Sequence, residues 1–589
     1  MQTAMEEVIE RSVIANRLDT IAKEMSYALE KSSRSPIFAE ACDFACGICN
    51  SRGELVSQIN GIPILAAAGT FSVQEVIAKY HEQIQEGDVF IINDPYQGGN
   101  HLPDIGIITP LIVKGEVLFY CVSRAHHGDI GGSVAGSYNA KATEIFQEGL
   151  RIPPIKLMSK GQMINEVMDL ITRNVRNPQM LQNDLWSQIG ANNIGIARLQ
   201  ELLQQYSATG IKKTLAYLLE HGEKMARLAI KALPDGEYSG EEWVDDDGFQ
   251  THPIKIKVTV KVRNEEMTLD FSGTDSQVKG FVNSAVVTST SAAWIGALWA
   301  LGPDIPRNSG AFRAIKVYLP KGSLVNPEDP APVTLSTLTP ASEIISAIFQ
   351  ALDSAAAERL PAGFGRYCGP SFYGLDPRNQ EFYVGFAFCA LGSGGGISGR
   401  DGYPYMAPLS NYGGVRAPNI EANEIQYPHL TLCHEIVMDS AGAGKWRGGP
   451  GVCYSLEFYG NPTNIVMFGD GMKIPPFGAH SGRPGSLNHS KLTRAGEAAL
   501  LLGSKEDARS LPPGSVLTMI SSGGGGWGDP YQREAEKVWR DVRDGYISVA
   551  RAREDYGVAL KNDGVDQEKT QKLRSQALGQ PQIGKINGT

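Results

Sequence analysis

Two short segments concentrate side chains that could bind a metal ion. Residues 93–104 read Asn-Asp-Pro-Tyr-Gln-Gly-Gly-Asn-His-Leu-Pro-Asp, and residues 124–129 read Arg-Ala-His-His-Gly-Asp. The spacing of His101 and Asp104, with a later histidine, offers imidazole nitrogen and carboxylate oxygen, a combination that suits Zn, Mn or Fe. Three protein ligands leave a coordination position for water or substrate, which is the arrangement of a reactive centre.

The elements that carry these segments are predicted to be neighbouring β-strands. Residues 88–92 form a short apolar run that is typical of a buried strand. Residues 105–113 and 116–123 have the pattern of two further strands, and Lys114-Gly115 is suited to a tight turn between them. This hairpin brings ligand types that are far apart in the sequence to one of its ends.

The predicted pairing leaves the identity of the second histidine open. With a two-residue turn and regular pairing, Pro103 lies opposite His126. Because side chains alternate between the faces of a strand, His101 and His126 then share one face, and Asp104 and His127 share the other. A kink at Pro103 would bring Asp104 round, so pairing alone does not choose between the adjacent histidines.

A further candidate ligand lies in an apolar strand predicted over residues 43–50. Cys42, Cys46 and Cys49 have a spacing used by radical-type iron–sulfur enzymes. Alternation places Cys46 and Cys49 on opposite faces, and cysteine is a common small buried residue, so we favour a structural role for them. Asp43 is more informative, since a carboxylate between apolar neighbours is costly to bury unless it is paired or bound to metal.

Composition bounds the class of protein. The 589 residues are 42% hydrophobic and 20% charged, as in ordinary soluble proteins. The formal charge of -10, without basic runs, argues against a nucleic-acid partner. No apolar run reaches the ~20 residues of a membrane span and no signal peptide is recognisable, so no membrane partner is expected. Eight cysteines in so long a chain favour a reducing, cytoplasmic location.

The patterning predicts a mixed α+β fold with mostly antiparallel sheets, packed helices, glycine-rich loops and a helical C-terminal tail. Residues 1–233 are expected to form an N-terminal α+β domain that carries the metal site, residues 234–530 a β-rich second domain, and residues 531–589 a charged helical tail. The Leu-Pro-Asp-Gly sequence that starts at Leu233 marks the first boundary, and the strict alternation of residues 254–262 begins the β-rich part. Helices are predicted over residues 6–25, 65–84, 165–171, 192–233, 284–301, 341–360 and 534–572.

Two catalytic motifs are absent from the sequence. It contains no Gly-x-x-x-x-Gly-Lys-Ser/Thr phosphate loop and no Gly-x-Ser-x-Gly nucleophile elbow. Any nucleotide chemistry is therefore expected to need a second polypeptide.

Several segments, taken together and in order, resemble the hydantoinase B/oxoprolinase family. The family includes B-type subunits of N-methylhydantoinase and caprolactamase, the matching half of 5-oxoprolinase, and related subunits of acetone and acetophenone carboxylases. The segments that carry the resemblance are residues 93–104, 124–132, 147–153, 270–275, 439–449 and 523–530.

The resemblance implies a metal-containing subunit of an ATP-dependent cyclic amide hydrolase. A larger hydantoinase A-type subunit binds ATP and Mg, phosphorylates a substrate oxygen, and assembles with this chain as α2β2 or larger. The substrate is a small lactam, hydantoin or 5-oxoproline ring. The family's ligands for one divalent metal (Zn, Mn or Fe) correspond to Asp43, His101, Asp104 and His126, which favours His126 over His127.

Other polar residues are candidates for supporting roles. His127 and Asp129 are candidate catalytic residues that orient water or move a proton, with Asn93 and Asp94 in support; a purely structural role for His127 is the alternative. Glu148 is a candidate ligand or base, although a solvated loop residue is the simpler interpretation. Two rival functions stay open: a subunit of an ATP-dependent ketone carboxylase, and a non-catalytic scaffold for the ATPase subunit.

Overall fold

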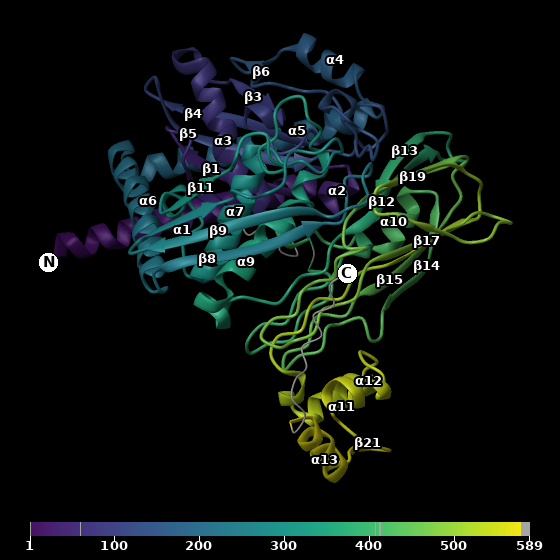
Figure 1. Cartoon of the computed structure of the whole chain (residues 1–589). Coiled ribbons are helices and arrows are strands. Elements are labelled where there is room, and N and C mark those ends of the chain that lie inside the picture. Colours follow the sequence, from purple (N-terminus) through teal and green to yellow (C-terminus); the bar gives the residue numbers. More distant parts are fainter. Residues whose placement is uncertain (1, 59–60, 407, 412–413, 579–589) are drawn as a thin grey trace.

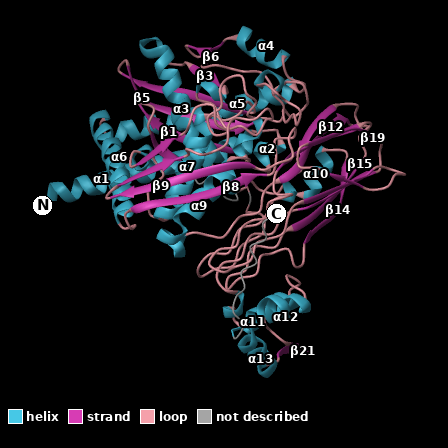
Figure 2. Ribbon diagram, viewed as in Figure 1, coloured by secondary structure: helices cyan, strands magenta, loops and turns pink. Residues whose placement is uncertain are grey.

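The computed structural model describes residues 2–58, 61–406, 408–411 and 414–578. It has the predicted α+β architecture, with helices packed on mostly antiparallel sheets (Figures 1 and 2). Among the described strands, parallel pairing joins only β10 (Glu266–Asp270) to β11 (Ile315–Tyr318). No described helix is both long enough and apolar enough to cross a membrane.

A seven-stranded sheet forms the centre of the N-terminal part. Its order is β2-β1-β5-β4-β3-β6-β7, and each neighbouring pair is antiparallel. The strands are β1 (Phe44–Asn50), β2 (Leu55–Gln58), β3 (Val89–Ile92), β4 (Asp104–Val113), β5 (Glu116–His126), β6 (Ile155–Ser159) and β7 (Gln162–Met163). β1, β3, β4 and β5 thus lie close to the ranges predicted for them.

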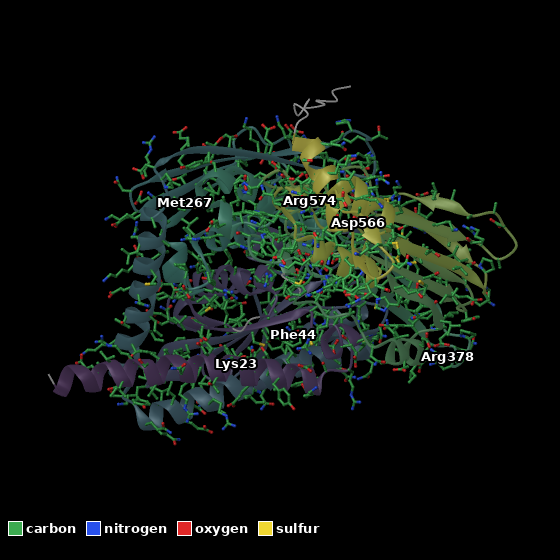
Figure 3. All side chains as sticks on the ribbon, turned by 90° about the horizontal axis from the view of Figure 1, so that it is seen from below. Lys23, Phe44, Met267, Arg378, Asp566 and Arg574 are labelled. Carbon is green, nitrogen blue, oxygen red and sulfur yellow. The ribbon has the colours of Figure 1, made fainter. Side chains whose placement is uncertain are left out.

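Helices cover both faces of this sheet, as its continuous apolar strands require. α3 (Pro63–Tyr80) packs on one face, where Val73 and Val76 join a buried cluster with Val122. α1 (Gln2–Ser32) and α5 (Pro178–Gln205) pack on the other face. Figure 3 shows α1, which carries Lys23, along one edge of the molecule and Met267 of β10 toward the opposite edge.

Cys42, just before β1, and Cys46 and Cys49, within it, lie in surroundings that suit a structural role. All three are buried, and Cys46 and Cys49 belong to different apolar clusters, so the predicted opposition of their faces is confirmed. The one group of potential metal ligands found in the described part of the chain contains no cysteine. The geometry thus provides no iron–sulfur site there.

A second sheet follows the N-terminal helices. It has the order β11-β10-β9-β8, with β8 (Gly236–Val244) and β9 (Ile254–Arg263), and α9 (Ala341–Ala356) packs on it while α7 (Val286–Leu301) packs on α9. The predicted boundary at residue 233 falls between α6 (Ala208–Lys231) and β8. The largest buried apolar cluster nevertheless includes residues from both sides of it.

Two further sheets and a bundle of loops make up the rest of the β-rich part. The sheet orders are β13-β12-β16-β19 and β14-β15-β20-β17-β18. The loops run side by side (Figure 2), and glycine permits this: a Cβ on Gly524 would lie 2.0 Å from the carbonyl oxygen of Gly394. The strands are β12 (Cys368–Leu375), β13 (Phe382–Phe386), β14 (His429–Ile436), β15 (Val452–Phe458), β16 (Thr463–Gly469), β17 (His489–Thr493), β18 (Leu500–Leu502), β19 (Glu506–Leu511) and β20 (Ser515–Ile520).

Two segments that were each predicted as a single helix, residues 192–233 and 534–572, contain more than one helix. Residues 192–233 belong to α5 and α6, which are separate because Ser207 caps α6 by accepting a hydrogen bond from the backbone N–H of Gly210 at 3.0 Å. The tail comprises three helices around a β21–β22 hairpin (Figure 1). The remaining elements are α2 (Pro36–Ala39), α4 (Asn165–Arg173), α8 (Ser309–Phe312), α10 (Ile420–Gln426), α11 (Ala535–Arg543), α12 (Val549–Tyr556), α13 (Gln567–Leu578), β21 (Leu560–Lys561) and β22 (Gly564–Val565).

Candidate metal centre

Three residues form a row across adjacent strands at one end of the seven-stranded sheet. Asp104, at the start of β4, is paired with His126, at the end of β5. On the other side of β5, the backbone N–H of His126 donates to the carbonyl of Asp43 at 3.0 Å, next to the pair of Phe44 with Ala125. Directly opposed residues of antiparallel strands point to the same face. The backbone therefore presents Asp43, His126 and Asp104 on one face.

A β-bulge sets this register, and the predicted register was wrong by one residue. Val113 faces Glu116 as expected, but the register shifts between Leu111 and Ile112, so Asp104 rather than Pro103 lies opposite His126. One extra residue in a strand moves all later side chains to the other face. The bulge, and not a kink at Pro103, thus unites Asp104 with His126.

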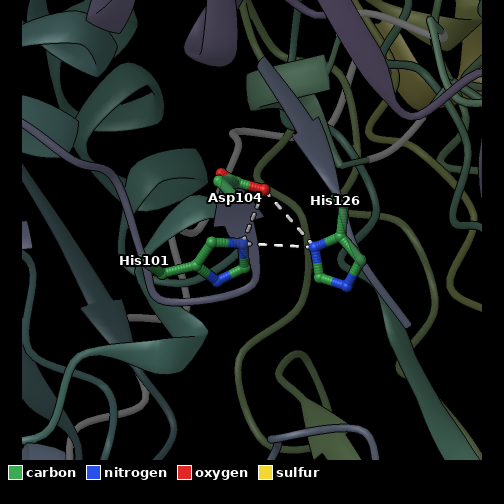
Figure 4. A group of neighbouring side chains, drawn as sticks. All are labelled: His101, Asp104 and His126. Atoms are coloured by element: carbon green, nitrogen blue, oxygen red, sulfur yellow. Dashed lines mark hydrogen bonds and ion pairs between the residues drawn. The ribbon is translucent and has the colours of Figure 1, made fainter. Parts of the chain in front are cut away.

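His101 completes a compact, buried group with these two residues (Figure 4). His101 Nε2 lies 2.9 Å from Asp104 Oδ1 and 3.2 Å from His126 Nδ1, and Asp104 Oδ1 lies 3.4 Å from His126 Nδ1. Ligand atoms about 2.0–2.2 Å from one divalent ion would be about 2.8–3.6 Å apart in octahedral or tetrahedral geometry. The three atoms are therefore spaced as ligands of a single ion.

The hydrogen bonds around this group fit a cation. His101 Nδ1 lies 2.6 Å from the carbonyl oxygen of Thr334, which can only accept, so Nδ1 carries a hydrogen, and in the neutral imidazole the lone pair of Nε2 faces Asp104. Metal-binding histidines usually donate to a carbonyl in this way. Asp104 Oδ2 is buried without a hydrogen-bond partner among the described residues, which costs free energy unless a cation is nearby.

The charges of the group favour an ionised Asp104. Burial opposes ionisation, but a His101 protonated on both nitrogens would attract Asp104 and donate to it from Nε2, which outweighs burial and holds the pKa of Asp104 well below its usual value. Burial also opposes a charge on His101, whose pKa is nevertheless raised by Asp104. Burial raises the pKa of Asp43 to about 6, against the opposing attraction of His126.

A small cavity of about 30 Å³ lies beside the group and is bordered by Asp43, Asp104 and His126. At roughly 10–15 Å³ per water centre it has room for about two waters. Much of the remaining wall is aromatic, including Tyr138 and Phe468, whose rings stack with centroids 3.9 Å apart. Asp43 thus shares the cavity, although it lies outside the group whose ligand atoms are all within 4.8 Å of one another.

The structure does not bring His127 to the group of His101, Asp104 and His126. Its Nε2 donates to the side-chain oxygen of Gln188 of α5 at 2.9 Å, and its ring packs edge-on against Phe38 at 5.1 Å. Burial lowers the pKa of His127 to about 4. It does not border the cavity, and its position matches the purely structural alternative.

The side chain of Asp129 also points away from the group of His101, Asp104 and His126. Its carboxylate accepts hydrogen bonds from the backbone N–H groups of Arg176 at 2.8 Å and Gly136 at 3.2 Å, and it pairs with the Arg176 guanidinium at 3.0 Å. These contacts fasten the loop after β5 to the start of α5. The carboxylate does not border the cavity.

Asn93 and Asp94 hold the loop that carries His101. The Asn93 amide nitrogen donates to the carbonyls of Leu102 at 2.7 Å and Leu150 at 3.0 Å. Asp94 pairs with the guanidinium of Arg151 at 3.0 Å. Their support of the site is therefore mechanical.

Glu148 is fully buried, so its interpretation as a solvated residue was wrong. Its carboxylate accepts from the backbone N–H groups of Val333 at 2.9 Å and Thr334 at 2.8 Å. Burial raises its pKa to about 7, against the opposing effect of those hydrogen bonds. Glu148 thus fixes the backbone at Val333 and Thr334, next to the Thr334 carbonyl that holds His101, and it is not a member of the group of three residues.

Arg124 was overlooked as a supporting residue, although it lies in one of the motifs. Its buried guanidinium donates to the carbonyl of Asp104 at 3.2 Å and to the hydroxyl of Ser72 in α3. The guanidinium passes over Gly106, where an added Cβ would meet it at 3.1 Å. Thr334 and Tyr138 were also missed, because no local pattern links them to the histidines.

Comparison with known proteins identifies the family. The sequence model described as hydantoinase B/oxoprolinase matches residues 7–530. The chain belongs to the hydantoinase B/oxoprolinase family. Caprolactamase subunit beta of Pseudomonas jessenii is 34% identical over 562 residues, which are 94% of this chain and 96% of that protein.

Solved structures agree with this family membership. The crystal structure of the ATP-dependent caprolactamase from Pseudomonas jessenii superposes with a TM-score of 0.90 at 32% identity, covering 96% of this chain and 99% of that chain. A nucleotide-free acetone carboxylase structure gives a TM-score of 0.88 at 22% identity, covering 98% of this chain and 84% of that chain. At that identity the carboxylase shows a shared fold alone.

Proposed function

We propose that this chain is the metal-containing subunit of an ATP-dependent cyclic amide hydrolase. The observation that carries the proposal is the convergence of three ligand atoms beside a cavity, in a chain that matches a caprolactamase over nearly its whole length. The relative named caprolactamase subunit beta supports an assembly with a separate A-type, ATP-binding subunit.

His101, Asp104 and His126 would hold one divalent ion, Zn, Mn or Fe, and Asp43 would be a fourth ligand from the cavity wall. When bound, such an ion lowers the pKa of a coordinated water and polarises a neighbouring oxygen. The chain's own contribution is to fix the ligands. Thr334 holds the tautomer of His101, and the carbonyl of Asp43 holds the backbone of His126.

The division of labour follows from amide chemistry. Resonance makes an amide carbonyl a poor electrophile. Phosphorylation of its oxygen in the partner gives an imidate-like carbon and a phosphate leaving group. Water then adds to this carbon, and the tetrahedral intermediate expels the ring nitrogen as an amine and leaves an acyl phosphate. A second water cleaves the acyl phosphate, which gives a linear amino acid and inorganic phosphate. In this scheme ATP and its Mg are handled by the partner.

The decisive experiment compares metal content and turnover. In complex with its partner, His101→Ala is expected to lose stoichiometric metal and to open lactam rings at least about 100-fold more slowly. His489→Ala, at an exposed histidine of β17, is the matched control and should keep both properties. A His101→Ala protein with one metal per chain and normal turnover would refute the proposal. Incorporation of labelled bicarbonate in place of ring opening would support the ketone carboxylase, and a metal-free wild-type chain with normal turnover would support the scaffold.

A further inference from the structure

The charges around the cavity bear on which ring can enter it. We infer that the site takes an uncharged ring, such as a simple lactam, and discriminates against rings that carry a carboxylate. This inference rests on the proposed function and narrows its substrate class.

The described wall of the cavity has anionic and neutral side chains but no cation. Asp43 and Asp104 border it, while lysine and arginine do not occur among its described residues. The five internal positions outside the described part, residues 59–60, 407 and 412–413, are Ile, Asn, Ala, Tyr and Gly in the sequence and add no charge. A substrate carboxylate would therefore find no basic partner in the described wall.

The arginines close to the site in sequence are engaged elsewhere. Arg124 donates to the carbonyl of Asp104 and to Ser72. Arg366, next to Tyr367 of the wall, is buried and paired with Glu343, Glu242 and Asp470. Arg416 follows Val415 of the wall, but its side chain is 63% exposed and lies 3.9 Å from Glu30.

The balance of charge leaves no surplus for a second anion. One divalent ion would neutralise the carboxylates of Asp43 and Asp104, with both imidazoles neutral as ligands. The activated ring already carries one anionic group, the phosphoryl group. A ring carboxylate would be a further charge removed from water without a partner, which costs far more than burial of a neutral group.

The uncharged part of the wall suits hydrocarbon. Tyr138 stacks on Phe468, and Phe386 packs edge-on against Tyr138 at 5.9 Å and against His126 at 5.6 Å. Polar ligands at one side and aromatic rings at the other match an amide joined to methylene groups. The cavity is smaller than a ring, so wall side chains must move on entry. A wall that closes around methylene groups leaves no polar group of the substrate unpaired. A wall that closes around a carboxylate leaves that carboxylate without a partner.

The test uses rings that differ only by a carboxylate. The metal-loaded complex is assayed with 2-pyrrolidinone against 5-oxoproline, and with 2-piperidone against 6-oxopiperidine-2-carboxylate. We expect kcat/KM to be at least ten-fold higher for the neutral member of each pair. Equal or faster opening of the carboxylated members would overturn the inference while leaving cyclic amide hydrolysis intact.

If neither member of a pair is opened, that result counts against the proposed function, and a binding experiment then tests the inference. Binding of each pair to the zinc-loaded chain is then measured by NMR titration. Weaker binding of the carboxylated members supports the inference, and equal or tighter binding overturns it.

A variant adds a cation where the wall lacks one. Asn411→Arg, on the cavity wall, is expected to shift the preference at least ten-fold toward the carboxylated rings, while Asn411→Gln leaves it unchanged. A folded Asn411→Arg protein with the wild-type preference would contradict the charge argument. If that variant does not fold, the comparison of matched rings with the wild-type chain still decides.

Discussion

At the scale of single residues, the site depends on side chains that do not touch the proposed ion. His101 keeps its lone pair toward Asp104 only because its other nitrogen donates to the Thr334 carbonyl. Glu148 accepts from the backbone N–H groups of Val333 and Thr334, so it acts on His101 through the backbone of Thr334. Buried partners of this kind orient the ligands of a metal centre.

This relay predicts the effect of Glu148→Gln. A carboxylate accepts from both N–H groups, whereas an amide accepts at one side and presents a donor to the other. We expect metal affinity to fall about 10–100-fold while the folded structure persists. Competition with a zinc chelator measures it, with Glu144→Gln, at an exposed glutamate of the same segment, as the control. Unchanged affinity in Glu148→Gln would show that Thr334 needs no such support.

At the scale of elements, the periodicity of apolar residues and the turn-forming residues predicted most strands and helices of the N-terminal part, because the apolar spacing there is regular. The pairing register of β4 with β5 could not be predicted in the same way. The register shifts between Leu111 and Ile112, and nothing in the apolar pattern of either strand reveals this bulge. The separation of α5 from α6 was missed because apolar residues continue across Ser207 at helical spacing.

The same scale gives a pH-dependent prediction for β14. His429 is buried, and neither ring nitrogen has a hydrogen-bond partner among the described residues. Burial lowers its pKa to about 4. The unfolded chain, with a histidine pKa of about 6.5, then binds more protons than the folded chain between pH 6.5 and 4, so stability falls as the pH drops through that window.

His429→Phe removes this penalty. Phenylalanine suits the site, because the imidazole already packs edge-on against Phe372 at 5.5 Å. The free energy of unfolding of the variant, taken relative to that of wild type, should be about 2 kcal/mol higher at pH 5 than at pH 7.5. Denaturant unfolding at both pH values measures this gain. A difference between the two proteins that does not change with pH would show that His429 is accessible to protons in the folded state.

At the scale of the whole molecule, the site is assembled from parts on both sides of residue 233. The proposed ligands come from the first quarter of the chain, but Thr334 and the aromatic wall at Phe386 and Phe468 come from the β-rich part. The sequence could single out the proposed ligands, since they lie in short motifs. It could not place Thr334, which is 233 residues from His101 and has no pattern that points to it.

This division predicts how truncated chains behave. A fragment of residues 1–233 retains every proposed ligand, yet it lacks the carbonyl that fixes His101 and exposes the part of the largest apolar cluster that packs against Val258 and Ile345. We expect this fragment to aggregate or to bind zinc at least ten-fold more weakly than the full chain. Residues 1–530 should bind zinc as the full chain does, because the tail adds no described residue to the proposed ligands or the cavity wall, and its small core around Val538 and Tyr556 includes only Ala443 from the described part of residues 1–530. Calorimetric titration of the three proteins with zinc measures the difference. Full-strength binding by the short fragment would mean that the seven-stranded sheet builds the centre unaided, and the role assigned to Thr334 would then be lost.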